Sequence, residues 1–336
     1  MIFVDLEQGT PAWQSWRWMG ITATESAVIM GLSPFKTPWR LWCEKVGRAR
    51  PEDLSVNPQV RYGKEMESIV RQKFQLQHDE ILLAQCAEFA KERLFRASFD
   101  GLTSADEPVE IKCPGAKTIE DIKELGRESE AFRLYNVQVQ HQMLVAESHR
   151  GWLVFYDAQA DGLIEFEIER DEDLITNILK SGRAFWQSVV SEKEPKKDPQ
   201  RDIFVPKSDE EIAQWCRLAA DYTAAARAVE DLKLQMDGLN LVRNRCKDRL
   251  ASMMGDYRFA DFAGVALTKR ASTGAVDYEK LCKAKGITPE ELASFRKEGK
   301  ESWLIRSTGS LMPKDFIDET MEENLQVADR GEAMWF

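Results

Sequence analysis

Two carboxylates and a lysine lie close together in this chain, in a pattern that suits phosphodiester chemistry. Asp100 ends a segment that alternates polar and apolar residues, and Glu110 and Lys112 lie two apart in a second alternating segment. Alternate residues of a strand project from one face, so Glu110 and Lys112 share a face that Asp100 can reach. Carboxylate oxygens suit Mg²⁺, and a bound metal lowers the pKa of a water and stabilises charge on a phosphate. Lys112 is placed to position or activate that water.

The two alternating segments, 96–99 and 109–112, are expected to form a hairpin. Asp100 and Gly101 provide a turn signal, and Val109 and Ile111 are expected to face the core. The alternative is an exposed hairpin that carries a Glu and a Lys on its solvent face, which is a common surface pattern.

The same residues resemble a known family. Asp100 followed by Glu110-Ile111-Lys112 resembles the Asp…(Asp/Glu)-X-Lys core of the restriction-endonuclease-like, or PD-(D/E)XK, nucleases. Residues 98–102, Ser-Phe-Asp-Gly-Leu, with Cys-Pro after the lysine, resemble the lambda-exonuclease branch, the YqaJ-like viral recombinases. The resemblance implies that Asp100 and Glu110 bind metal, with the Ile111 carbonyl as a further ligand, and that Lys112 activates the attacking water.

An arginine lies within a tryptophan-rich segment near the N-terminus. Pro11 suits a helix start, and Trp13, Trp16 and Met19 recur at helical spacing, which favours a core role for the tryptophans. Arg17 among them needs an anionic partner, and arginine is well suited to bidentate phosphate recognition.

Arg17 with Ile-Thr-Ala-Thr at 21–24 resembles the motif with which the family binds the 5′-phosphate of a DNA end. The implied pocket here is Arg17, Thr22 and Thr24, with Ser98 reaching in from the first alternating segment. Thr24 stands where the family often has Ser. Helix capping alone is an equal alternative for the two threonines.

Two further helices are expected to serve the site. Residues 63–67, Gly-Lys-Glu-Met-Glu, match a family motif that implies Glu67 as an additional acid of the metal site. The alternative for Glu67 is a solvated carboxylate stabilised by the helix dipole. Val60, just ahead, lies where the family places an apolar wedge against the terminal base pairs, although a small Val is a poor wedge.

The second of these helices is predicted over residues 132–146. Tyr135, Gln138 and Gln142 are three and four residues apart and therefore line one stripe. The resemblance assigns Gln138 to the active site, with Tyr135 supporting it. His141 is interpreted as structural.

The remaining pattern predicts an α/β domain with a mixed sheet. An apolar run at 151–157 predicts a buried strand, 163–169 alternates as a half-exposed strand, and 172–190 is helical. We expect a restriction-endonuclease-like nuclease core flanked by helices over residues 1–195, bounded by a polar, proline-bearing linker at 191–200.

A mostly helical C-terminal region is predicted over residues 205–336, with an accessory or assembly role. Residues 209–254 are Ala- and Leu-rich, and Asp237-Gly238 suggests a break into two helices. Residues 257–269 suggest a β-hairpin, and another helix is expected from Asp277.

Composition limits the alternatives. No apolar run is long enough to span a membrane, and the N-terminus lacks the pattern of a signal peptide. The six cysteines form no Cys-X-X-Cys pair, which favours a reduced, cytoplasmic protein of a bacterial or phage-infected cell without a zinc or iron–sulfur site. The formal net charge of −11 argues mildly against nucleic acid, unless a basic patch lies within an acidic surface. No phosphate-binding loop of the GxxxxGK[S/T] type is present, so we expect no ATP requirement.

Taken with the resemblance, the sequence predicts a Mg²⁺-dependent exonuclease, with Mn²⁺ able to substitute. It would digest double-stranded DNA from a 5′-phosphate end and leave a 3′ single strand. The resemblance further implies a homotrimeric ring and a single-strand annealing protein as partner in phage-type recombination. The alternatives are a restriction-type endonuclease and a noncatalytic DNA-end-binding scaffold. A CRISPR-adaptation nuclease of the same fold is disfavoured because that group anchors an iron–sulfur cluster through four cysteines.

Overall fold

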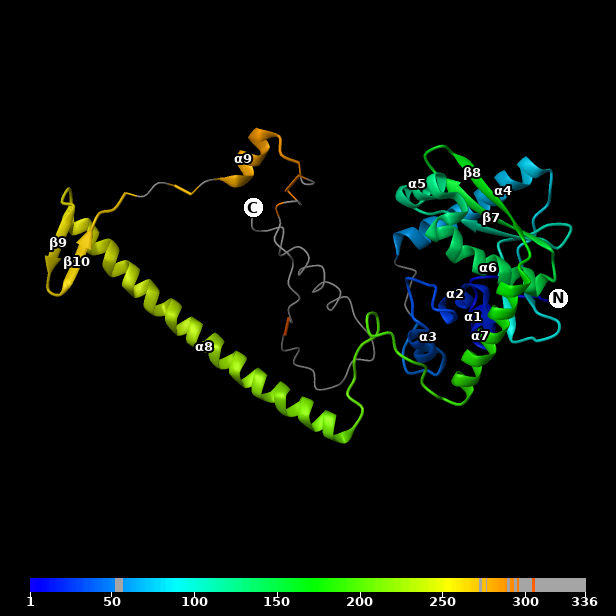
Figure 1. Ribbon diagram of the computed structural model, residues 1–336, viewed down its shortest axis with the longest axis horizontal. Coiled ribbons are helices and arrows are strands. Elements are labelled where there is room, and N and C mark those ends of the chain that lie inside the picture. Colours follow the sequence, from blue (N-terminus) through cyan, green and yellow to red (C-terminus); the bar gives the residue numbers. More distant parts are fainter. Residues whose placement is uncertain are drawn as a thin grey trace. The chain divides into compact units, whose positions relative to one another are not determined.

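The computed structural model describes residues 1–51, 57–271, 274–275, 277–288, 291–292, 295 and 304–305 (Figure 1). The chain divides into two compact units, Met1–Ile203 (unit 1) and Phe204–Phe336 (unit 2). Unit 1 holds two four-stranded sheets, and unit 2 holds a long helix, a two-stranded hairpin and a short helix.

The first sheet of unit 1 has the strand order β1-β3-β4-β2. Its strands are β1 (Ile2–Val4), β3 (Gln85–Glu88), β4 (Phe95–Phe99) and β2 (Ile21–Thr22). β3 runs antiparallel to β1 and β4, whereas β2 runs parallel to β4.

The second sheet has the order β5-β6-β7-β8. Its strands are β5 (Gly101–Leu102), β6 (Pro108–Lys112), β7 (Arg150–Asp157) and β8 (Gly162–Glu169). β6 and β7 are parallel and the other pairs are antiparallel, which confirms a mixed sheet.

The predicted hairpin of 96–99 with 109–112 is wrong, because β6 pairs with β5 and β7 while β4 belongs to the first sheet. Asp100 lies at the step between the sheets. Gly101 follows it, and a Cβ there would lie 2.9 Å from Leu82 Cδ1, so any other residue would have to displace the Leu82 side chain.

Helices surround and separate the two sheets (Figure 1). They are α1 (Pro11–Trp18), α2 (Ala23–Ile29), α3 (Pro38–Lys45), α4 (Pro58–His78), α5 (Ala116–Leu125), α6 (Glu130–Ala146) and α7 (Glu172–Val190), with a 3₁₀ turn, η2, at Gly126–Glu128. Side chains at the N-caps fix several starts: Thr10, Thr37, Asn57, Ser129 and Asp171 each accept a hydrogen bond from the first turn. Because Asn57 and Pro58 start α4, Val60 lies in its first turn and not in a preceding loop.

α6 is the central helix of unit 1. Val137 and Leu144 pack into the core formed with Phe95 and Phe99, while Val139 and Met143 pack with the second sheet. A helix that is apolar on most of its circumference is buried on most of it, and residues 137–146 of α6 are all buried. α6 therefore fixes the two sheets relative to each other.

Unit 2 is built on α8 (Asp209–Met254), which is followed by β9 (Phe259–Phe262), β10 (Val265–Thr268) and α9 (Tyr278–Lys285). β9 and β10 form the predicted hairpin, with Ala263 and Gly264 both at positive φ in its turn. The predicted break at Asp237-Gly238 is wrong, because α8 is continuous over 46 residues. One interior glycine lowers helix stability by only about 1 kcal/mol relative to alanine, which the other residues of a long helix outweigh. In the described part of the chain no helix is both long and apolar enough to cross a membrane.

Candidate active site

Asp100, Glu110 and Lys112 come together where the two sheets meet. Asp100 Oδ2 accepts a hydrogen bond of 2.9 Å from the backbone N–H of Ile111, which ties the end of β4 to β6. Lys112 Nζ forms an ion pair with Glu110, whose side chain is almost fully buried. The alternative of an exposed Glu and Lys on a hairpin is therefore excluded.

Two amides of α6 complete the surroundings of Glu110. Gln138 Nε2 donates to Glu110 Oε1 at 2.6 Å, and Gln142 Nε2 donates to Oε2 at 2.5 Å. The helical spacing placed Gln142 on the same stripe as Gln138, but no role was predicted for it. Its spacing of four residues from Gln138 is the signal that could have found it.

The electrostatics of the cluster reflect its burial. Burial raises the pKa of Asp100 well above its usual range, and the negative charge of Glu110 raises it further. Burial acts to lower the pKa of Lys112, but the charges of Glu110 and Asp100 outweigh it and raise that pKa above its ordinary value. The Lys112 ammonium also lies 4.8 Å from the centre of the Tyr135 ring, so Tyr135 lies beside the cluster.

Glu67 approaches the cluster from α4. It forms an ion pair with Arg71 one turn later, and burial raises its pKa against the opposing charge of Arg71. Glu110 is close enough to raise the pKa of Glu67 further, so the alternative of an independent, solvated carboxylate does not describe it.

A cavity of about 1340 Å³ opens over this cluster. Six of the predicted site residues line it: Val60, Glu67, Asp100, Ile111, Lys112 and Tyr135. Glu110 and Gln138 are not among the lining residues and contact the site through Lys112 and each other.

The donor atoms of this cluster suit a hard cation. Asp100, Glu110 and Glu67 offer carboxylate oxygens, and the charge of Glu110 acts to raise the pKa of both Asp100 and Glu67, so a further positive charge would stabilise the ionised cluster. Among the described residues, however, no three acidic, His or Cys side chains are arranged as a ready-made metal site. Glu110 is turned to Lys112 and the two amides, and Glu67 is turned to Arg71.

Arg17 lies in a second group of predicted residues, on α1. Its guanidinium stacks over the Trp13 ring at 4.6 Å, and within the described part of the chain it makes no hydrogen bond or ion pair. Burial lowers its pKa, although the charges of Glu25, Glu110 and Asp100 act to raise it. A desolvated guanidinium with unused donors is suited to bind an anion.

The hydroxyls predicted beside Arg17 differ in their surroundings. Ser98 Oγ accepts a hydrogen bond of 2.8 Å from the indole of Trp13, which links it to the ring under Arg17. Thr22 caps α2, with its N–H donating to Glu25 Oε2 at 2.9 Å, yet its own Oγ1 is buried and has no hydrogen-bond partner in the described structure. Thr24 is exposed in the first turn of α2. None of these residues lines the large cavity, although Arg17 is close enough to Glu110 and Asp100 for their charges to act on its pKa.

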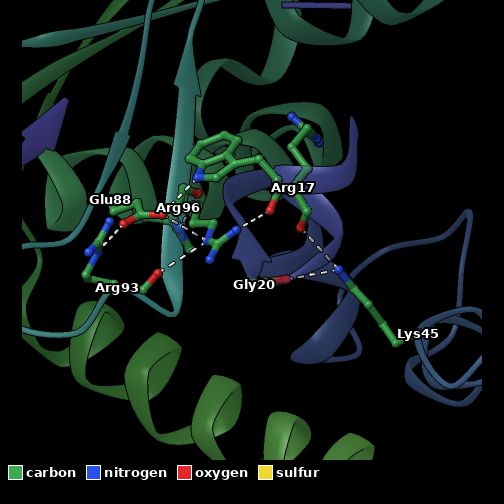
Figure 2. Close-up of polar contacts among 8 residues, drawn as sticks. Arg17, Gly20, Lys45, Glu88, Arg93 and Arg96 are labelled. Atoms are coloured by element: carbon green, nitrogen blue, oxygen red, sulfur yellow. Dashed lines mark hydrogen bonds and ion pairs between the residues drawn. The ribbon is translucent and has the colours of Figure 1, made fainter. Parts of the chain in front are cut away.

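A polar framework holds the segment that carries Arg17 (Figure 2). Lys45 Nζ donates to the carbonyls of Trp18 and Gly20 at 3.3 and 2.9 Å, and more weakly to that of Arg17, so it is the backbone of Arg17 that is fixed here and not its guanidinium. No pattern in the sequence predicted this role of Lys45.

Arg96 holds the other side of the same segment. It donates to the carbonyl of Trp16 and lies 3.6 Å from Glu88, which in turn accepts from the Trp16 indole at 2.8 Å (Figure 2). Gly20 fits closely here, because a Cβ would lie 2.6 Å from the carbonyl oxygen of Leu94.

The fold and this cluster define unit 1 as a mixed α/β domain with a buried carboxylate–lysine–amide site beside a large cavity. Residues 12–149 match the YqaJ-like viral recombinase domain. The match spans both the Arg17 segment and the carboxylate cluster. It supports a nuclease function for unit 1.

A curated relative is similar to most of the chain. The uncharacterized protein YqaJ of Bacillus subtilis (strain 168) is 24% identical over 311 residues, which cover 87% of this chain and 92% of that protein. Because 87% of the chain exceeds the 203 residues of unit 1, this likeness continues into unit 2.

The solved structures cover only about half of the chain. An alkaline exonuclease from Laribacter hongkongensis is 26% identical, with a TM-score of 0.47 over 55% of this chain and 94% of that one. A phage-related exonuclease from Haemophilus somnus 129PT is 13% identical, with a TM-score of 0.42 over 52% of this chain and 96% of that one.

Proposed function

We propose that unit 1 is a metal-dependent deoxyribonuclease that digests double-stranded DNA from a 5′ end and leaves a 3′ single strand. The observation that carries the proposal is the convergence of Asp100, Glu110 and Lys112 beside a large cavity. The family match supports a nuclease, and the resemblance of the Arg17 motif to an end-binding site supports exonuclease action with this polarity.

Asp100 and Glu110 are the residues that would hold Mg²⁺, or Mn²⁺ in its place, with the Ile111 carbonyl and Glu67 as further oxygen ligands. The ion would supply Lewis-acid stabilisation of the phosphate and a water of lowered pKa. Lys112 would hold and activate the attacking water, and Gln138 would keep the Glu110 carboxylate in place. Tyr135 supports Lys112 through its ring face. No residue of this set calls for ATP.

Arg17 would bind the 5′-phosphate. Its guanidinium has free donors, and the unpartnered hydroxyl of Thr22 and the Ser98 hydroxyl are the polar groups of the same segment. Thr24, which is exposed, would add a contact at the rim. Val60, in the first turn of α4 and on the cavity wall, would contact the terminal base pairs as the wedge.

One digestion series tests the catalytic part of this proposal. We expect the full chain with Mg²⁺ to digest linear double-stranded DNA, to spare closed circles, and to stop in EDTA. Lys112→Ala should lower the rate about 100-fold or more, since removing one positioned, charged hydrogen-bond donor from an active site typically costs at least that factor. Lys91→Ala, whose exposed lysine lies outside the cavity, is the control and should digest like the wild type. Cleavage of closed circles would instead identify a restriction-type endonuclease, and binding of DNA ends without digestion would identify a noncatalytic scaffold. Unchanged digestion by Lys112→Ala would refute the catalytic role of Lys112.

A comparison of DNA ends tests the role of Arg17. We expect 5′-phosphate ends to be digested faster than 5′-hydroxyl ends, and Arg17→Ala to reduce this preference about tenfold, which corresponds to the loss of a charged hydrogen bond. Arg183→Ala removes an arginine that is paired with Glu92 on the surface, and it should keep the preference. An Arg17→Ala chain that still discriminates between the ends would contradict the assignment.

The resemblance also supports two assembly proposals for this function. We propose that the chain forms a homotrimeric ring around the DNA. We also propose that a single-strand annealing protein receives the 3′ strand. The molar mass of the full chain in solution tests the ring, and a monomer would contradict it.

A further inference from the structure

α8 carries apolar residues at two positions of a seven-residue repeat, with one exception. Six successive heptads supply two positions each, three residues apart. The first positions are Trp215, Tyr222, Val229, Met236, Arg243 and Leu250, and the second are Leu218, Ala225, Leu232, Leu239, Cys246 and Met253. Arg243 is the one charged residue among them. We call these twelve residues the α8 seam.

The seam lies open in the described structure. No residue of α8 is buried, and Leu232 and Leu239 are 63% and 72% exposed. Among the described residues, two contacts outside the helix involve its first turns: Trp215 packs beside Phe204 at 5.8 Å, and the Tyr222 hydroxyl donates to the carbonyl of Ile305 at 2.8 Å. An apolar stripe of this length on a soluble protein marks an interaction surface.

The period of the stripe identifies the kind of partner. A repeat of seven residues corresponds to 3.5 residues per turn, which keeps a seam in contact only with a helix that supercoils around it. Six heptads exceed the about three to four that distinguish a coiled coil from an ordinary amphipathic helix. The 46 residues of α8 form one unbroken helix, about 69 Å long at the standard rise per residue (Figure 1).

We propose that α8 forms an antiparallel two-stranded coiled coil with α8 of a second copy of this chain. The partner has to offer an equally long heptad seam, and the chain itself provides one. The association is independent of the nuclease assignment, because it uses no residue of unit 1.

The side chains of the seam favour the antiparallel direction. In a parallel pair each residue faces its own copy, so two Arg243 side chains, two Trp215 and two Ala225 would meet. In an antiparallel pair with full overlap, large residues face small ones: Arg243 faces Ala225 and Tyr222 faces Cys246. The remaining facing pairs are Trp215 with Met253, Leu218 with Leu250, Val229 with Leu239, and Leu232 with Met236.

The charges beside the seam agree with this direction. In the antiparallel pair Asp221 faces Arg249 of the second copy, and symmetry repeats this ion pair at the other end. In the parallel pair Asp221 faces Ala226 and Arg249 faces Met254, which gives no ion pair. The one like-charged pair of the antiparallel arrangement is Lys233 with its own copy, and long lysine side chains can extend into solvent.

Light scattering on the full chain tests the association with closely matched variants. Leu232→Glu with Leu239→Glu places two charges in the seam, whereas Leu234→Glu with Leu241→Glu places them on the opposite face. The control leucines are 65% and 69% exposed, so both pairs start from similar exposure on the same helix. We expect the seam variant to have half the molar mass of the wild type and the control to keep it, whatever assembly unit 1 adopts. A wild-type monomer, or a seam variant of unchanged mass, would overturn the proposal.

Disulfide cross-linking tests the direction. In a background with Cys216→Ser and Cys282→Ser, oxidation should leave the chain unlinked if the helices are antiparallel, because the two Cys246 residues then lie about 36 Å apart along the seam. Adding Tyr222→Cys should produce a covalent dimer, and Cys246→Ser should abolish it. Linkage of the background chain through Cys246, or of the Tyr222→Cys chain without Cys246, would establish the parallel pair and overturn the proposal.

Discussion

At the scale of single residues, the site is organised around one buried anion. Glu110 is almost inaccessible to solvent, and a buried carboxylate is tolerated only where charges and hydrogen bonds replace water. Lys112, Gln138 and Gln142 provide this replacement from a strand and a helix. The motif predicted Lys112 and Gln138, but the stacking of Arg17 on Trp13 could not be predicted, because it depends on how α1 is oriented against β4.

His141 shows how a buried group of α6 makes stability depend on pH. Its Nε2 lies 3.1 Å from the carbonyl of Arg96, which can only accept, so Nε2 carries the proton and Nδ1 accepts from the Ser26 hydroxyl at 2.6 Å. Burial lowers the pKa of His141 to about 4, from an ordinary value of 6.5. The ring is therefore structural and neutral, as the sequence indicated.

This lowered pKa predicts a loss of stability in acid. Between pH 6.5 and about 4 the unfolded chain binds a proton at His141 that the folded chain does not, so the free energy of unfolding decreases as the pH falls through this range. The decrease from this residue is at most about 3 kcal/mol. Denaturant unfolding measured at several pH values should give a shallower slope for His141→Gln than for the wild type. The exposed His149 is the control, and His149→Asn should keep the wild-type slope. Equal slopes for wild type and His141→Gln would refute the assignment.

At the scale of elements, periodicity predicted the bounds of several strands and helices well and the pairing of the strands less well. The apolar run at 151–157, the alternation at 163–169 and the helical pattern at 172–190 correspond to β7, β8 and α7 within one residue. The hairpin was wrong because Asp100 and Gly101 lead the chain from one sheet into the other, and alternation within a segment carries no information about which strand it pairs with.

α8 illustrates the opposite limitation. Asp237-Gly238 has the composition of a turn, but both residues lie outside the α8 seam, and the helix continues through them. The local turn composition therefore does not interrupt a helix of 46 residues. The seven-residue repeat was visible in the sequence, and it assigns the helix a partner where the composition alone indicated only an accessory region.

At the scale of the whole molecule, the acidic net charge does not extend into the cavity. Five basic side chains line it, Lys64, Lys112, Lys117, Arg133 and Arg201, against five acidic ones, Glu67, Asp100, Asp121, Glu130 and Asp198. The chain as a whole has a net charge of −11, so the excess acid lies elsewhere on its surface. Net charge therefore constrains nonspecific attraction to DNA more than it constrains the chemistry of the cavity.

Residues 191–203, at the C-terminal end of unit 1, are bound to the rest of that unit. Glu194 accepts from the indole of Trp39 at 2.6 Å, Arg201 donates to the carbonyl of Ser33 at 2.7 Å, and Thr37 donates to Asp202 at 2.6 Å. Residues 191–200, which the sequence indicated as a linker, thus cover α3. The predicted ranges 1–195 and 205–336 stay a prediction that truncation can test.

We predict that unit 1 folds by itself only if this segment is kept. The hydrophobic clusters of the described chain all lie within residues 1–203, so a chain that ends at Ile203 should unfold at nearly the temperature of unit 1 in the full chain. A chain that ends at Val190 exposes α3 and leaves the buried Trp39 without its hydrogen-bond partner, at roughly 1–3 kcal/mol for that group alone. Calorimetry of the two truncated chains should therefore show a clearly lower melting temperature for the shorter one. Equal melting temperatures would mean that residues 191–203 only connect the units, and a loss of folding in both would mean that unit 1 depends on unit 2.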